Sequence, residues 1–117
     1  MWEPAPCLPT LPKLAEMSQL SEMTEAVVNW IRPLLSDDSR DPMNTSIKPS
    51  EEASELTHAI YTNDDVGQEC ADVLILLLDI AFLRGINLED EFNKKMVENR
   101  DRIWNREKGC LKHEHTN

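Results

Sequence analysis

The chain has 117 residues, 5% of them aromatic, with three glycines and a formal net charge of −10 at pH 7. This length suits one domain with a modest core, and the acidic balance argues against a nucleic-acid-binding protein, which normally presents a basic face. Helix-favouring Leu, Ala, Met, Glu and Lys are common, so the composition predicts an all-α fold.

The sequence also argues against export and membrane insertion. Prolines interrupt residues 1–12, where a signal peptide would need a continuous apolar segment. The longest apolar run, residues 71–83, contains two aspartates and is too short to span a bilayer. The three cysteines are scattered and form no disulfide framework, which suits a reducing compartment. We therefore expect a cytoplasmic protein that binds neither membranes nor nucleic acids.

The amino-terminal part predicts an extended arm, one helix and a loop. Residues 1–13 form a proline-rich arm, because proline lacks the backbone N–H that a helix interior needs. Residues 36–49 are mostly polar, include two prolines and are predicted to be an exposed loop. Between them, over about residues 14–35, a helix is predicted from apolar residues spaced by three and four: Leu20, Met23, Val27, Trp30, Ile31 and Leu34.

Three more helices are predicted, over about residues 51–61, 66–84 and 88–104. Residues typical of helix ends stand beside them: Ser50 before the first, Gly85 after the second and Asn87 before the third. The prediction is therefore a four-helix domain over residues 14–108, followed by a tail over residues 109–117.

The helix over residues 66–84 is apolar nearly all round between Val73 and Leu83, which is typical of a helix enclosed on every side. A four-helix chain of this size can hardly enclose it, so we predict a homo-oligomer, a dimer or a dimer of dimers. The alternative is a central helix within a monomer. Asp79 lies in this apolar stretch and should pair with a basic side chain from another helix or subunit.

Two acidic clusters stand on the predicted helices: Glu51, Glu52 and Glu55, then Glu69 and Asp72. Residues three or four apart share a helix face, so antiparallel packing of the two helices would bring these carboxylates together. At ~5 Å and an effective dielectric near 20, each like-charged pair would cost roughly 3 kcal/mol. Magnesium would relieve this repulsion, since it prefers oxygen ligands and engages phosphates. The alternative is a solvated acidic surface.

The last predicted helix carries Lys95, Asn99 and Arg102 on one stripe. Lys95 and Arg102 could neutralise a phosphate tail, although each could equally be an ordinary surface cation. Asn99 could bind phosphate oxygens or a base edge, or bond to its own helix neighbours or water.

His58 and Trp30 are further candidates for substrate binding. His58 follows Glu55 by three, and this E-x-x-H spacing forms half of a di-iron or di-manganese site in helical bundles. The chain has no matching second motif, so a hydrogen bond to a carboxylate or a substrate, or a plain surface histidine, is favoured. Trp30 could stack on a base, but its apolar stripe favours a place in the core.

Together these motifs resemble the MazG-like, all-α nucleoside triphosphate pyrophosphohydrolases. The family pattern E-E-x-x-E followed by E-x-x-D stands here as Glu51-Glu52-Ala53-Ser54-Glu55 and Glu69-Cys70-Ala71-Asp72, with KMVENRDRIW (residues 95–104) on the basic helix. The resemblance covers residues 20–113. It implies hydrolysis between the α and β phosphates, giving a nucleoside monophosphate and pyrophosphate, with Mg²⁺ or Mn²⁺.

The resemblance also implies roles for the acidic residues. Glu52, Glu55, Glu69 and Asp72 would hold the metal ions, and Glu51 and Glu52 are the catalytic candidates, Glu51 as a ligand or just outside the ligand set. The ions would orient a water and lower its pKa, and a glutamate not fully committed to metal would accept its proton.

The family's known substrates leave the nucleobase open. Members that resemble this chain include dUTP, dCTP and dGTP enzymes, among them phage MazZ-type proteins that remove dGTP or GTP. We slightly favour dGTP or GTP, and a location in a bacterium or, for a phage protein, in its host's cytoplasm. The alternatives are a non-catalytic helical oligomerisation module and a di-iron or di-manganese bundle, neither of which accounts for the stripe of Lys95, Asn99 and Arg102.

Overall fold

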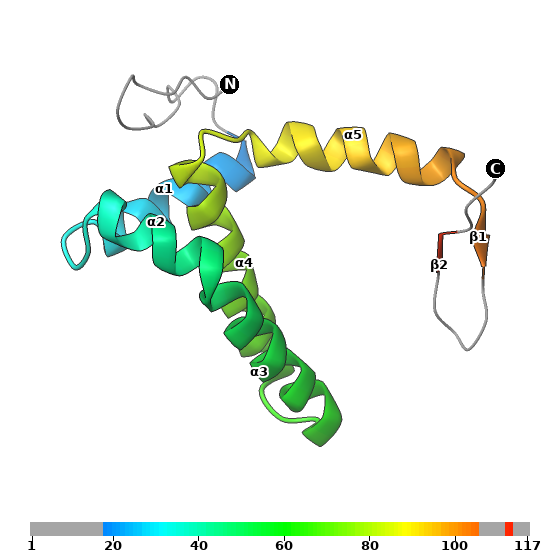
Figure 1. The fold of residues 1–117 in the computed structure, drawn as a ribbon, viewed down its shortest axis with the longest axis horizontal. Helices are drawn as coiled ribbons and strands as arrows, with labels where there is room; N and C mark the ends of the chain where they lie inside the picture. Colours follow the sequence, from blue (N-terminus) through cyan, green and yellow to red (C-terminus); the bar gives the residue numbers. More distant parts are fainter. Residues whose placement is uncertain (1–17, 106–111, 114–117) are drawn as a thin grey trace. The chain divides into compact units, whose positions relative to one another are not determined.

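The computed structural model describes residues 18–105, 112 and 113, so the predicted arm and most of the predicted tail lie outside the described residues. The described part is almost entirely helical, and the predicted all-α class is confirmed. It contains five helices (Figure 1): α1 (Gln19–Ile31), α2 (Asp37–Ser46), α3 (Lys48–Thr62), α4 (Val66–Leu83) and α5 (Leu88–Asp101). Two short strands, β1 (Trp104–Asn105) and β2 (Lys112–His113), pair antiparallel.

The chain divides into two compact units, Met1–Asn87 and Leu88–Asn117. The first contains α1 to α4, and the second contains α5 and the two strands. The predicted domain over residues 14–108 stays a prediction. None of the described helices combines the length and the apolar character that crossing a bilayer requires.

Helices α3 and α4 lie side by side as an antiparallel pair (Figure 1). Two residues of the turn between them, Asn63 and Asp65, both have φ 55° in the left-handed region. Asn and Asp tolerate this conformation better than other side chains. The backbone N–H of Asn63 bonds to the carbonyls of Ala59 and Ile60, which closes the end of α3. This turn therefore reverses the chain within a few residues.

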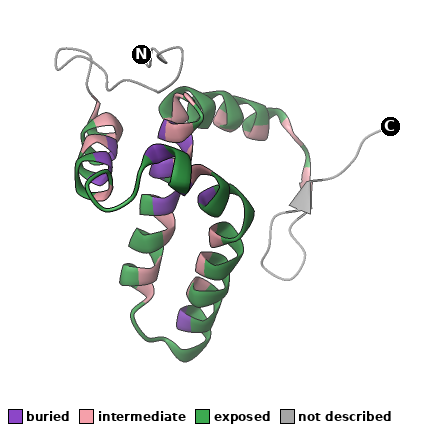
Figure 2. Cartoon of the chain, turned by 60° about the vertical axis from the view of Figure 1, so that its left-hand side comes forward, coloured by how far each residue is buried: buried purple, intermediate pink, exposed green. Residues whose placement is uncertain are grey.

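The core of the first unit lies where α1 and α2 pack against α4. Val28, Leu78 and Phe82 are almost fully buried there, and Figure 2 shows the buried residues gathered on the facing sides of these helices. The Arg32 guanidinium lies 5.0 Å from the centre of the Phe82 ring, a cation–π contact at the edge of this core.

The prediction of an exposed loop over residues 36–49 is wrong, because α2 occupies most of this segment. Its polar composition and its prolines are typical of loops, but neither proline prevents helix formation here. Pro49 lies in the first turn of α3, where a missing N–H is harmless, and Pro42 lies inside α2. The signal for α2 was Ser36, whose side chain accepts a hydrogen bond from the N–H of Ser39, followed by Asp37 and Asp38.

Three predicted boundaries also need correction. Helix α1 ends at Ile31, before Pro33, because proline ends the hydrogen-bond ladder earlier than the apolar stripe suggests. Helix α3 begins at Lys48 after Ile47, so Ser50 lies inside it and does not cap it. Helix α5 ends at Asp101, and Trp104 lies in β1.

Candidate metal and substrate site

Three carboxylates from the two acidic clusters meet between α3 and α4. Glu52 comes from α3, and Glu69 and Asp72 come from α4; one oxygen of each lies within 4.8 Å of the others. The antiparallel pairing brings them together, since Glu69 and Asp72 share a face of α4 that is turned toward Glu52. We call these three residues the acidic triad.

Two other predicted residues stand close to the acidic triad. Glu55 is exposed on α3, and its charge acts on both Glu52 and Glu69. Glu51 is exposed and does not join the triad; its Oε2 lies 3.5 Å from the Nζ of Lys48. The structure thus gathers Glu55 near the triad and directs Glu51 toward a cation.

The pKa values of Glu52 and Glu69 are raised, which means that the cluster disfavours the charged form of both carboxyls. Burial raises the pKa of Glu52 above its usual range, and Glu55, Asp72 and Glu69 raise it further, against an opposing effect of Lys48. Burial, then Glu55, Asp72 and Asp65, raise the pKa of Glu69. A proton or a cation would therefore relieve the unfavourable interactions of both groups.

The hydrogen bonding of these two glutamates points to a cation. The Oε2 atoms of Glu52 and Glu69 are buried and have no hydrogen-bond partner within the part of the chain that the structure describes. Such atoms are rare in folded proteins unless water or an ion satisfies them. Oxygen ligands in this number suit Mg²⁺ or Mn²⁺, whose charge would also offset the mutual repulsion. The residues present therefore fit a divalent metal.

Lys48 is a residue that the sequence analysis did not single out. It precedes Glu51 and Glu52 by three and four positions, and its Nζ lies 3.9 Å from Oε1 of Glu52. That helical spacing was the available signal. Lys48 places a positive charge beside the acidic triad.

A cavity of about 220 Å³ adjoins the triad. Glu52, Asp72 and Lys48 contribute to its wall, and so does Asp79, which lies two helical turns, or ~10 Å, from Asp72 along α4. Apolar side chains line much of the rest: Val27, Trp30, Ile31, Leu35, Met43, Ile75 and Leu76. The cavity is smaller than the roughly 300–1,000 Å³ of sites that enclose drug-sized ligands, so it suits one part of a nucleotide.

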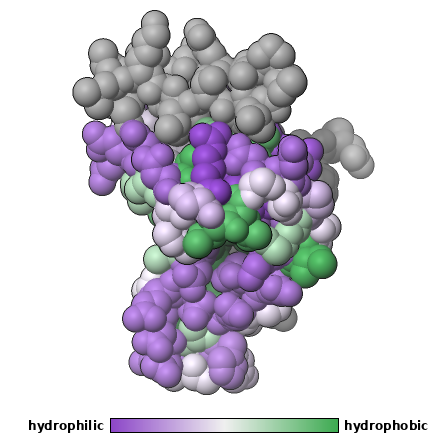
Figure 3. Space-filling model, turned by 90° about the vertical axis from the view of Figure 1, so that its left-hand side faces the viewer, coloured by the Kyte–Doolittle hydropathy of each residue, from purple (hydrophilic) through white to green (hydrophobic). Residues whose placement is uncertain are grey.

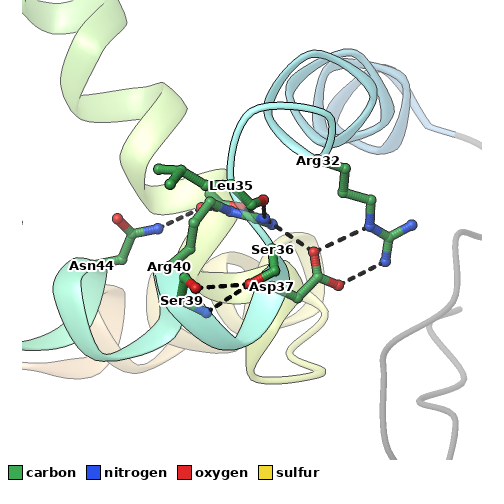
Figure 4. Close-up of polar contacts among 8 residues, drawn as sticks. Arg32, Leu35, Ser36, Asp37, Ser39, Arg40 and Asn44 are labelled. Atoms are coloured by element: carbon green, nitrogen blue, oxygen red, sulfur yellow. Dashed lines mark hydrogen bonds and ion pairs between the residues drawn. The ribbon is translucent and has the colours of Figure 1, made fainter.

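A buried polar network from α2 forms another part of the cavity wall (Figure 4). Arg40 is 1% exposed and pairs with Asp79, its Nε and Nη2 each 3.0 Å from a carboxylate oxygen. Its Nη1 donates to the carbonyl of Leu35 and lies 3.0 Å from Asp37. Asn44 donates through Nδ2 to Asp79. The prediction that Asp79 pairs with a basic side chain from another helix is confirmed.

This network keeps its charges despite burial. Burial alone would lower the pKa of Arg40, but the hydrogen bonds and charges of Asp79 and Asp37 raise it on balance. Arg32 donates two hydrogen bonds to Asp37, the shorter of which is 2.9 Å long, and these bonds hold the pKa of Asp37 below its usual range. Arg40 and Asn44 were missed from the sequence, because nothing in a polar segment shows that a partner 39 or 35 residues away will bury it.

Trp30 and His58 lie in different places. Trp30 is 59% exposed and lines the cavity, so the interpretation as a core residue is wrong. Its stripe on α1 points partly toward the cavity rather than into the core. His58 is exposed on α3 and borders a separate surface hollow with Glu55, Asp65 and Glu69. His58 therefore stands beside the acidic residues but does not line the cavity.

Lys95, Asn99 and Arg102 belong to the second unit and bond within it. Lys95 Nζ lies 3.3 Å from Glu98, and Arg102 contacts both Glu98 and the Oδ1 of Asn99. In the structure Asn99 therefore bonds to a near neighbour in the sequence, which was one of the two alternatives. Their role in substrate binding stays a prediction.

Comparison with known proteins identifies relatives of this chain. No protein-family model matches the sequence. A dATP/dGTP diphosphohydrolase of Cyanophage S-2L is 39% identical over 88 residues, which are 74% of this chain and 80% of that protein. A dATP/dGTP diphosphohydrolase of Salmonella phage PMBT28 is 46% identical over 68 residues, which are 57% of this chain but 22% of that protein.

A solved structure also resembles this fold. It is the Cyanophage S-2L MazG-like pyrophosphohydrolase bound to dGDP and three catalytic Mn²⁺ ions per active site. The two chains are 27% identical with a TM-score of 0.56, and the match covers 86% of this chain and 97% of the other. The similarity therefore extends over most of both molecules.

Proposed function

The chain belongs to the MazG-like family of nucleoside triphosphate pyrophosphohydrolases, and from this premise we propose that it hydrolyses purine deoxynucleoside triphosphates between the α and β phosphates. The observation that carries the proposal is the acidic triad beside a cavity of nucleobase size. Membership in this enzyme family sets aside the non-catalytic module and the di-iron bundle.

We propose that Glu52, Glu69 and Asp72 hold the divalent ions, with Glu55 as a further ligand. The support is chemical: their oxygens converge, two are buried without partners among the described residues, and their charges repel. Mg²⁺ is the proposed ion and Mn²⁺ the alternative; the related structure contains Mn²⁺. When bound, such ions polarise phosphate oxygens and lower the pKa of a coordinated water.

The remaining site residues are proposed to bind substrate or handle its proton. Glu51 and Glu52 remain the proposed catalytic pair, since Glu51 stands outside the triad and could accept a proton from water. Lys48 would contact a phosphate, because its positive charge lines the cavity and lies close to Glu52. Lys95, Asn99, Arg102 and His58 are kept as proposed substrate-binding residues.

The cavity is the proposed place of the nucleobase. Trp30 and the aliphatic side chains beside it could contact the faces of a base, which are apolar and stack on aromatic rings. The names of the two phage relatives favour purines, and dGTP or GTP is the substrate that the sequence slightly favours.

We also propose that the enzyme is a homo-oligomer. An apolar groove of about 400 Å³ runs between α1 and α4, lined by residues that include Met23, Leu74 and Ile75. Leu77 of α4 is 46% exposed, and Figure 3 shows hydrophobic side chains gathered on one face of the molecule between hydrophilic ones. Exposed apolar surface of this kind is typical of protein–protein contacts.

The decisive experiment measures pyrophosphate release from dGTP and dATP with Mg²⁺ or Mn²⁺. We expect no turnover in EDTA and recovery when metal is restored. Glu52→Gln and Asp72→Asn should each lower kcat by at least about 100-fold, because even residues that only support metal ligands cost 10- to 100-fold. Helicity should be unchanged.

A matched control is Glu22→Gln, which removes an exposed carboxylate from the first turn of α1. It should keep the turnover of the unmodified enzyme. Turnover by both Glu52→Gln and Asp72→Asn at the unmodified rate would refute the assignment of the triad.

A further inference from the structure

Asn44 has a side-chain amide whose orientation is imposed by its neighbours. It is 6% exposed, and its Nδ2 donates to Oδ2 of Asp79. Arg40 donates to both oxygens of the same carboxylate, at 3.0 Å each. A carboxylate held in this way can only accept, so Asn44 must turn its NH₂ group toward it. The opposite orientation would set two oxygens against each other.

This orientation leaves the Oδ1 of Asn44 as the available acceptor. No donor to Oδ1 occurs among the residues that the structure describes, and Figure 4 shows this oxygen turned away from the network. Asn44 also lines the cavity that reaches the acidic triad. An amide oxygen that lines a cavity and is free to accept offers a ligand one directed hydrogen bond.

We propose that Asn44 recognises the nucleobase, its Oδ1 accepting a hydrogen bond from an exocyclic amino group. The inference rests on the proposed function, in which the phosphates bind at the triad. Asp79, to which Asn44 bonds, lies ~10 Å along α4 from Asp72, a spacing that leaves the length of a sugar between a base at Asn44 and phosphates at the triad. Arg40 and Asp79 act as positioning residues, because their hydrogen bonds fix the orientation of the amide.

The predicted chemical class is therefore a triphosphate whose base carries an amino group. Trp30, Leu35 and Ile75 supply apolar surface for the faces of the ring, and none of these three side chains can accept a hydrogen bond. Without its amino group, a base would leave Oδ1 buried and unpaired, which is what makes such a site selective.

The test compares two matched substrate pairs with the metal-loaded enzyme. One pair is dGTP and dITP, which differ by the 2-amino group; the other is dATP and the triphosphate of purine deoxyriboside, which differ by the 6-amino group. For at least one pair, kcat/KM should be about 5- to 150-fold lower without the amino group, as expected for one unpaired buried acceptor.

The variant Asn44→Leu keeps a similar volume and removes the acceptor. It should lower kcat/KM for the amino-bearing substrate to that of its amino-free partner, so that their ratio approaches one. Thr45→Ala, on the exposed side of the same helix, should keep the original ratio. If Asn44→Leu does not fold, Asn44→Ala replaces it, and the comparison in the unmodified enzyme needs no variant.

The outcomes separate this inference from the proposed function. If the unmodified enzyme hydrolyses none of the four substrates, both are overturned. If it hydrolyses them without preference for an amino group, or if Asn44→Leu keeps the preference, the inference alone is overturned. A preference that disappears in Asn44→Leu and survives in Thr45→Ala supports it.

Discussion

Arg40 is the most deeply buried charged side chain described in this protein, at 1% exposure. Two carboxylates, Asp37 and Asp79, and the carbonyl of Leu35 surround its guanidinium. A guanidinium can be buried only when its N–H groups find acceptors in this way, because an unpaired charge inside a protein is very costly. Arg40 therefore fastens α2 to α4 at the wall of the cavity.

Removing Arg40 should destabilise the fold strongly. Arg40→Ala is expected to lower the free energy of unfolding by about 3–5 kcal/mol, because the charge of Asp79 is then left buried without a counter-charge. The double variant Arg40→Met with Asp79→Leu should recover much of this loss, since it removes both charges. Urea denaturation measures all three proteins.

Arg84→Ala is the control for this comparison. Arg84 pairs with Asp41 at 3.0 Å, but its side chain is 50% exposed, so its loss should cost at most about 1 kcal/mol. Equal effects of Arg40→Ala and Arg84→Ala would contradict the role assigned to the buried network.

Glu52 and Glu69 give the metal-free protein a characteristic dependence on pH. Their pKa values are raised in the folded state, so the folded protein binds these protons more tightly than the unfolded chain does. The contribution of these two groups to the free energy of unfolding should therefore fall as the pH rises above about 4.5, the usual value for glutamate. Saturating Mg²⁺ or Mn²⁺ should remove this loss, because the metal favours the charged carboxylates.

Denaturant titrations in EDTA at several pH values measure this effect. Glu52→Gln should reduce the loss of stability with rising pH. Glu22→Gln changes a carboxylate of α1 that does not belong to the acidic triad, so this variant should lose stability as the unmodified protein does. The same dependence of stability on pH in Glu52→Gln and in the unmodified protein would argue against the repulsion.

Helix α2 shows how a polar segment becomes an ordered element. It has no apolar stripe of its own, and its buried residues are Asp37, Arg40 and Asn44. Its start depends on Ser36, whose Oγ accepts a hydrogen bond from the N–H of Ser39 at 3.2 Å. The helix is thus held by its cap and by polar bonds to α4 rather than by hydrophobic burial.

Loss of the cap should weaken α2 measurably. Ser36→Ala is expected to lower the free energy of unfolding by about 1 kcal/mol, because the N–H of Ser39 loses its partner. Ser50→Ala is the matched control: Ser50 lies inside α3, where alanine is the better helix former, so stability should be unchanged or rise by up to about 0.5 kcal/mol. Thermal or urea unfolding distinguishes the two; a larger cost at Ser50 would support the cap that the structure rejects.

The first unit leaves apolar side chains of α1 and α4 exposed, among them Trp30, Ile75 and Leu77. A chain of this length has a large surface for its volume and cannot cover every apolar face of α4. A second copy of the chain could cover such faces, because a symmetric dimer brings the same patch of each subunit into contact.

If the chain forms a homo-oligomer through these faces, assembly should depend on the exposed apolar side chains of α4. The unmodified protein should sediment with the mass of a dimer or a larger assembly, and its thermal midpoint should rise with concentration. Leu77→Lys should shift the equilibrium toward the monomer, whereas Gln68→Lys, at an exposed polar position of the same helix, should not. A monomeric mass for the unmodified protein at all concentrations tested would refute the oligomer.

The features that local spacing controls were predictable. Glu52, Glu69 and Asp72 could be assigned to shared helix faces because the helical repeat relates residues three and four positions apart. The helices α3, α4 and α5 could be located within a few residues for the same reason, and Asp79 could be expected to need a cation because a carboxylate in an apolar helix must be compensated.

The features that depend on distant partners were not predictable. Whether Arg40 and Asn44 are loop residues or buried helix residues depends on Asp79, which lies 39 and 35 positions away in the sequence. The exposure of Trp30 and the cavity that it lines depend likewise on how α1 packs against α4. Helical periodicity relates residues only a few positions apart, so the helices α3, α4 and α5 and their faces could be predicted from the sequence alone. The selection of buried polar pairs required the folded chain, because the free energy of such a pair exists only once both partners have left water together.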